Sequence, residues 1–225
     1  MKLVKQAVWG VALATLLTAS SAAGPIVDRV VASVNGHVVL QSDWEDEVAF
    51  EALADGRAPD SFTAAERTAA LDRLIDQELL REQVRPSLPA PADQVAERVA
   101  EIRKLQPDAT TDDGWGATLK RSGLTQSALE KRLSDEIQLM KLVNDRLRPS
   151  VQIDQKAVEA YYQDELLPKL KQAGGKAKPL TEVYGRIKTL LAEQKLNELL
   201  TGWLASLRSG SHIRTPEPSA GEGNR

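Results

Sequence analysis

Strand-forming sequence is concentrated near the two ends of the chain. Residues 26–40 read IVDRVVASVNGHVVL, which places two β-branched runs on either side of Asn35-Gly36. This dipeptide favours a type I′ hairpin turn, in which both central residues take a positive φ. A two-residue turn at this place pairs Val34 with His37 and Ala32 with Val39. The next strand-like segment is SHIRT at residues 211–215. Because an isolated two-stranded hairpin is marginal in water, we expect residues 211–215 to add a third strand, so that the two ends meet.

Apolar residues between these ends recur every three or four positions, which predicts helices. The stripe in residues 125–147 is the most regular and consists of Leu129, Leu133, Ile137, Met140, Val143 and Leu147. Ser42 to Glu45 and Thr63 to Glu66 both match the capping box S/T-x-x-E, which begins a helix. The expected helices cover about 43–54, 63–85, 92–105, 115–121, 125–147, 154–170 and 181–207. The fold class is therefore mainly α, a helical bundle with a small antiparallel sheet formed by the N-terminal hairpin and a C-terminal strand. We expect the helix over 181–207 to pack on the helices of the first half.

The first 23 residues have the layout of a secretory signal peptide. Lys2 and Lys5 precede the apolar run 7–18, and small residues fill positions 19–23. Twelve apolar residues are too few for a comfortable membrane span of about 20, although an uncleaved anchor is the alternative. We expect cleavage after Ala23, a periplasmic mature protein without stable membrane insertion, one domain over residues 24–215 and a disordered tail over 216–225.

Composition excludes several classes of protein. The 225 residues contain 29 Lys and Arg and 32 Asp and Glu, and the chain after residue 23 carries a net charge of −5, since the first 23 residues hold two lysines and no acid. This balance argues against nucleic-acid binding, which depends on basic residues. Residues 119–133 have the shape of a DNA-binding helix–turn–helix, but the acidic net charge argues against DNA binding. We therefore interpret them as a corner between two helices of the bundle. The chain has no cysteine, so a thiol nucleophile and a cysteine-ligated metal are excluded.

The sequence offers little for catalysis, and we expect no catalytic residue, no metal and no cofactor. The chain has no phosphate-binding G-x-x-x-x-G-K-[ST] motif, so ATP is not expected. Asp43, Glu45, Asp46 and Glu47 resemble an acid–base cluster, but acids are also favoured in the first turn of a helix. His37 and His212 would lie near each other if the ends pair, yet further metal ligands are lacking.

Four aromatic residues stand on short helices or in loops, where they are candidates for lining a groove that binds unfolded polypeptide. They are Trp44, Phe50, Phe62 and Trp115. Apolar surface with few directional polar groups suits a binder that accepts many sequences. The alternative is that they form small cores under loops.

The chain resembles the N-terminal chaperone module of SurA-type periplasmic proteins. The residues that carry the resemblance are, in chain order, 27–36 with 38–43 (VDRVVASVNG, VVLQSD), 71–80 (LDRLIDQELL), 123–125 (GLT), 157–162 (AVEAYY) and 190–200 (LLAEQKLNELL). In such proteins, parvulin-like prolyl isomerase domains usually lie between the Tyr-Tyr helix and the closing helix. Here 17 residues, 163–179, separate the two, whereas a folded domain needs at least about 50.

The resemblance therefore implies the chaperone part without the isomerase part. It implies a periplasmic, ATP-independent holdase that is not an enzyme and that binds unfolded exported polypeptides such as outer-membrane protein precursors. Two alternatives stay open, a dedicated assembly subunit of one envelope complex and a prolyl isomerase. The chain can be a monomer or a dimer swapped through the Gly174-Gly175 connector.

Overall fold

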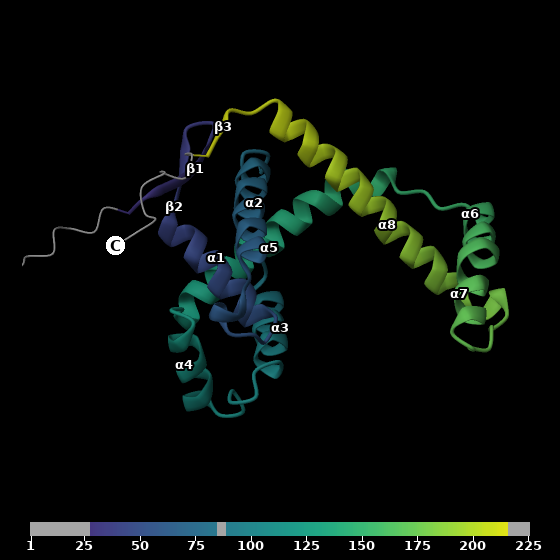
Figure 1. Cartoon of the computed structure of the whole chain (residues 1–225), viewed down its shortest axis with the longest axis horizontal. Coiled ribbons are helices and arrows are strands. Elements are labelled where there is room, and N and C mark those ends of the chain that lie inside the picture. The colour runs from purple at the N-terminus through teal and green to yellow at the C-terminus, as the bar shows by residue number, and fades with distance from the viewer. Residues whose placement is uncertain (1–27, 85–88, 216–225) are drawn as a thin grey trace, which may run out of the picture.

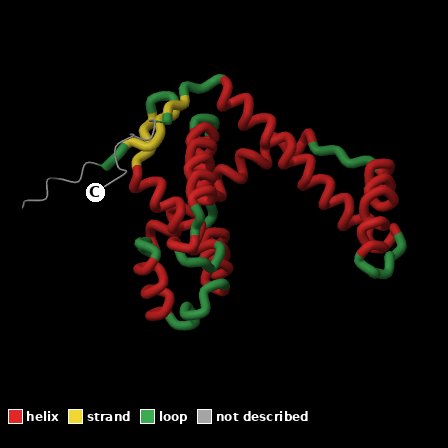
Figure 2. The backbone as a smooth tube through the Cα atoms, viewed as in Figure 1, coloured by secondary structure: helices red, strands yellow, loops and turns green. Residues whose placement is uncertain are grey.

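The two ends of the described chain meet in a three-stranded antiparallel sheet. The computed structural model describes residues 28–84 and 89–215. Its strands are β1 (Val30–Val34), β2 (His37–Leu40) and β3 (Ile213–Arg214), in the order β2-β1-β3. Figure 2 shows the sheet beside the C-terminal end of the last helix. The predicted fold class is confirmed. The predicted signal peptide and tail lie outside the described residues, and the extent of the domain stays a prediction.

The hairpin has the predicted turn and register. Asn35 has φ 50° and Gly36 has φ 94°, as a type I′ turn requires. Val34 pairs with His37 and Ala32 pairs with Val39, and an irregularity follows between Val30 and Ala32. The left-handed conformation at position 35 suits asparagine, which tolerates it better than other non-glycine residues.

Asn35 also fastens the C-terminal strand to the hairpin. Its backbone N–H donates to the His212 carbonyl at 3.0 Å, and its side-chain oxygen accepts from the His212 N–H at 2.8 Å. Its side-chain NH₂ donates to Glu82 at 2.8 Å and to Ser211 at 3.2 Å. One side chain thus joins segments 176 residues apart.

The rest of the described chain consists of helices and the loops that connect them. They are α1 (Gln41–Ala54), η1 (Pro59–Ser61), α2 (Ala64–Arg81), α3 (Ala92–Lys104), α4 (Asp112–Arg121), α5 (Gln126–Leu147), η2 (Arg148–Ser150), α6 (Gln155–Ala160), the π-helical turn η3 (Tyr161–Leu166), α7 (Leu167–Gln172) and α8 (Leu180–Ser209). The widened turn η3 ends two residues before Pro168, which lacks an N–H and whose ring would clash with the Asp164 carbonyl in a regular helix.

One of the two predicted capping boxes is wrong. Helix α1 begins at Gln41, before the predicted start, and Asp43 accepts the Leu40 N–H at 2.8 Å. Ser42 instead donates its hydroxyl to Asp28. The Thr63–Glu66 box is confirmed, since Thr63 accepts the Glu66 N–H at 3.2 Å and Glu66 accepts the Thr63 N–H at 2.7 Å.

Two helical lobes are joined by α8. In the main lobe, α1, α3, α4 and α5 enclose a core in which Leu129 and Leu133 are fully buried; burial of one such side chain contributes about 1.5–3 kcal/mol. In the distal lobe, α6, η3 and α7 pack on the N-terminal half of α8 around Val158 and Tyr162. Figure 1 shows α8 running from the sheet to this lobe. The prediction that the last helix packs on the first-half helices is confirmed for α2, which the C-terminal half of α8 contacts, and this half also contacts α5.

The Glu66 carboxylate is expected to make stability depend on acid pH. The Arg57 guanidinium, followed by the Thr63 N–H, lowers the pKa of Glu66 from its usual 4.5 to about 2. A lowered folded-state pKa gives stability that is present above pH 4.5 and is lost as the pH falls towards 2. Carbon-detected NMR titration should give a Glu66 midpoint near 2, and the difference in Tm between the wild type and Glu66→Gln should close over this window. A midpoint near 4.5 would contradict the capped and ion-paired geometry.

Candidate functional site

A groove opens between α1, α2 and α5 on one side and the C-terminal half of α8 on the other. Its volume is about 610 Å³, and residues of α1, α2, α5 and α8 line it. This volume is within the range of about 300–1,000 Å³ that is typical of ligand pockets. Its apolar lining consists of Phe50, Ala54, Leu80, Leu139, Met140, Val143, Leu200 and Leu204. The groove therefore offers apolar surface on several elements.

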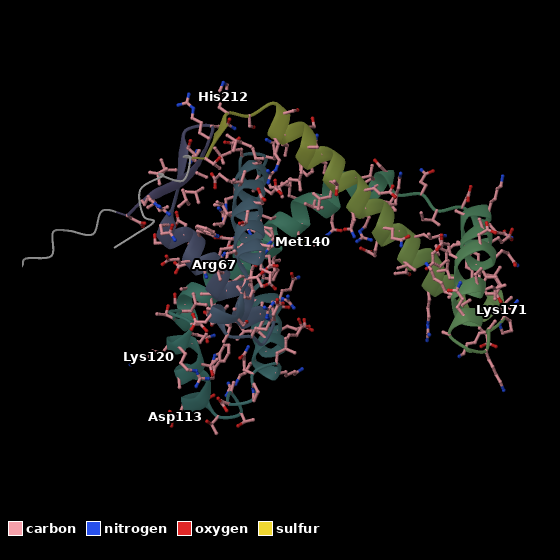
Figure 3. The ribbon with its side chains drawn as sticks, viewed as in Figure 1. Arg67, Asp113, Lys120, Met140, Lys171 and His212 are labelled. Carbon is pink, nitrogen blue, oxygen red and sulfur yellow. The ribbon has the colours of Figure 1, made fainter. Side chains whose placement is uncertain are left out.

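Met140 is the most open part of this lining. Its neighbours Leu139 and Val143 are buried against Leu80 and α8, whereas Met140 is 52% exposed. Figure 3 labels Met140 on α5, in the middle of the molecule. The predicted single apolar stripe of α5 does not hold at Met140, because the buried face of the helix passes from Leu129 and Leu133 to Leu139 and Val143. A methionine on an open apolar surface adapts to ligands of different shape.

A buried ion pair lies in the wall of the groove. Glu47 on α1 is 2% exposed and pairs with Arg132 on α5. Glu47 also accepts the side-chain N–H of Gln77 at 3.2 Å. The Arg132 guanidinium lies over the Phe50 ring at 4.5 Å, and burial lowers the pKa of Arg132 below its usual value. The pair ties α1 to α5 beside the groove.

The charged residues along the groove are mainly acidic. Six carboxylates and three guanidinium groups line it. The arginines pair with protein carboxylates: Arg73 with Glu51, Arg81 with Glu78, and Arg132 with Glu47. Asp55 and Glu136 are exposed and form no ion pair within residues 28–84 and 89–215. The groove therefore has a net negative charge.

A second hollow of about 440 Å³ adjoins the groove under β2. It shares Arg81, Arg132 and Asp135 with the groove. Val38 on the edge strand β2 lines it and is 53% exposed. The surface available to a ligand therefore extends from the groove towards the sheet.

The four predicted aromatic residues are not gathered in one site. Phe50, Phe62 and Trp115 are buried in the clusters of the main lobe, and Trp44 is partly buried between two of them. Trp44 donates its indole N–H to the Arg67 carbonyl at 2.7 Å, and Trp115 donates to Gln126 at 2.8 Å.

Of the four, Phe50 lines the groove, and Trp115 lines a separate hollow of about 480 Å³. Their part in client binding stays a prediction, and their packing is that of core residues. Sequence reasoning missed the groove that Met140 on α5 lines together with Leu200 and Leu204 on α8. The signal that points to it is the adjacent Leu139-Met140, which cannot both face one side of a helix.

The polar clusters have structural partners. Asp43 caps α1, Glu45 accepts from Gln41 at 2.8 Å, and Glu47 forms the buried pair. His37 lies 3.6 Å from Glu78, and His212 serves through its backbone in the sheet. Within the described ranges, no three His, Cys, Asp or Glu residues are arranged to hold a metal ion.

The described helices also bear on membrane insertion. None of those in residues 28–84 and 89–215 has the length and apolar character needed to cross a bilayer.

The sequence comparison placed the usual position of an isomerase domain between Tyr162 and Leu180. In this protein the segment consists of the rest of η3, α7 and a loop.

Comparison with protein families identifies the main lobe. The model of the SurA-like N-terminal domain matches residues 2–143, which is more than half of the chain. The chain belongs to this family. The match covers the hairpin and α1 to most of α5, which contribute most of the groove, and α8 lies beyond it. A search of curated proteins gives no match. The SurA-like family is one of periplasmic, chaperone-type modules.

Proposed function

We propose that this SurA-like protein is an ATP-independent holdase of the periplasm. The observation that carries the proposal is the open apolar groove, lined by the exposed Met140, in a chain of this family. A holdase binds apolar segments of unfolded chains and so lowers the concentration of the species that aggregate. The proposal includes export by the N-terminal signal peptide and a soluble mature protein.

The groove suits clients of varied sequence. Its apolar residues come from several helices, and the flexible Met140 side chain can follow the shape of different ligands. Exported outer-membrane barrel precursors are suitable clients, because their strands carry apolar side chains at alternate positions. Release without ATP requires reversible binding, so we expect a Kd on the order of 1 μM, equivalent to about −8 kcal/mol.

The proposal is that the protein is not an enzyme. The clusters of carboxylates and histidines in the described chain have caps, ion pairs or sheet contacts as partners. We therefore expect no acceleration of proline-limited refolding, a process that takes about 10–100 s uncatalysed. Acceleration in proportion to protein concentration would contradict this part of the proposal.

The test of holdase activity is dilution of a urea-denatured outer-membrane barrel protein into buffer with the purified protein. Light scattering should fall in proportion to the protein added and be largely suppressed near a stoichiometric ratio. A protein that is helical by circular dichroism but leaves scattering unchanged would contradict the proposal. Pull-down of a single specific envelope partner would then favour a dedicated assembly subunit.

A further inference from the structure

The groove is lined by more carboxylates than cations, and the ion pairs within the protein do not neutralise all of these carboxylates. Arg73, Arg81 and Arg132 each have a carboxylate partner inside the protein. Asp55 at the end of α1 and Glu136 on α5 are exposed at the groove. In residues 28–84 and 89–215 neither has a cation within 4 Å, although the more distant charges of Arg57 and Arg73 act on Asp55 and that of Arg132 acts on Glu136. The three arginines of the groove are thus already paired with carboxylates of the protein, while Asp55 and Glu136 remain available to a cationic ligand.

A third carboxylate has a partner that a ligand can replace. Asp135 pairs at 2.9 Å with Lys131, one turn earlier on α5, and the Lys131 side chain is 78% exposed. Exposed pairs of this kind contribute little to stability, about 0–1 kcal/mol. A lysine or arginine of a bound chain can therefore take the place of Lys131 at little cost.

We propose that the groove selects cationic apolar segments, in which an apolar cluster is flanked by lysine or arginine. This inference rests on the proposed function and names its substrate class. The apolar cluster covers Met140 and the neighbouring leucines, and the flanking cations meet Asp55, Asp135 and Glu136. Acidic segments are repelled by the same carboxylates, so discrimination comes from repulsion as well as attraction.

The test uses three fluorescent peptides with the same apolar centre and flanks of lysine, glutamine or glutamate. Anisotropy titration with the full-length protein should give the lowest Kd for the lysine peptide and a Kd about tenfold higher for the glutamate peptide at 20 mM salt. The difference should shrink to less than threefold at 0.5 M salt, because salt screens exposed charges.

Charge-reversal variants locate the effect. Asp55→Lys with Glu136→Lys should remove or invert the preference. Glu97→Lys with Asp164→Lys is the matched control, because it changes net charge equally at exposed positions outside the groove. The control should keep the preference of the wild type.

The outcomes separate this inference from the proposed function. Equal binding of the three peptides by the wild type, or an equal change in the two double variants, would overturn the charge selectivity and leave the holdase in place. No binding of any peptide, together with unsuppressed aggregation, would overturn both.

Discussion

Replacing Arg132 by methionine is expected to lower the free energy of unfolding by about 3–5 kcal/mol. The substitution leaves the Glu47 carboxylate, which is 2% exposed, with the Gln77 amide as its remaining partner. A buried charge without a counter-ion is among the costliest defects in a core. Urea denaturation at pH 7, followed by circular dichroism, measures the loss.

Removing both charges is the control. The double variant Glu47→Leu with Arg132→Met should recover most of the loss, since well-packed apolar replacements of a buried ion pair are often neutral. Lowering the pH from 7 to 5 should reduce the deficit of the single variant, because proton binding neutralises the orphaned carboxylate. A single variant within 1 kcal/mol of the wild type would show that the pair is solvated.

Met140→Asp is expected to raise the amount of protein needed to suppress aggregation by about tenfold. The new carboxylate replaces the most exposed apolar residue of the groove lining, where bound apolar side chains would have to desolvate it. Met140 is 52% exposed, so the fold should be retained. Light scattering of a denatured barrel protein, measured over a range of chaperone concentrations, gives the ratio.

Leu105→Asp is the matched control. Leu105 is 56% exposed and does not line the groove. The same loss of apolar surface and the same gain of charge at this place should leave suppression unchanged. Equal losses in the two variants would mean that the effect comes from general surface hydrophobicity.

Short sequence patterns were enough to predict the hairpin turn and the start of α2. Asn35-Gly36 specifies its turn through backbone conformation, and the Thr63–Glu66 box specifies a helix start through hydrogen bonds three residues apart. The need of the hairpin for a third strand then predicts the pairing with residues 211–215. The turn and the helix start depend on residues that are neighbours in the sequence, whereas the third strand was inferred because residues 211–215 are the strand-like segment that follows the hairpin.

The groove depends on the packing of distant elements and could not be predicted in this way. The side chains of Leu139 and Met140 point to different sides of α5, and only the position of α8 decides which is covered. Ser42 was predicted to cap a helix, but Asp28 offers it a better partner from outside the local window. Phe50 and Trp115 were predicted at a binding surface because they stand near loops, yet tertiary contacts bury them.

Photo-crosslinking from the groove tests the central claim most directly. A benzophenone amino acid replaces Met140 in one variant and Leu105 in another, and each is irradiated with a urea-denatured barrel protein freshly diluted into buffer. The account predicts a covalent client adduct from position 140, reduced by competing apolar peptide, and little adduct from position 105. Strong adducts from position 105, with none from position 140 in a variant that still suppresses aggregation, would place the client elsewhere and contradict the account.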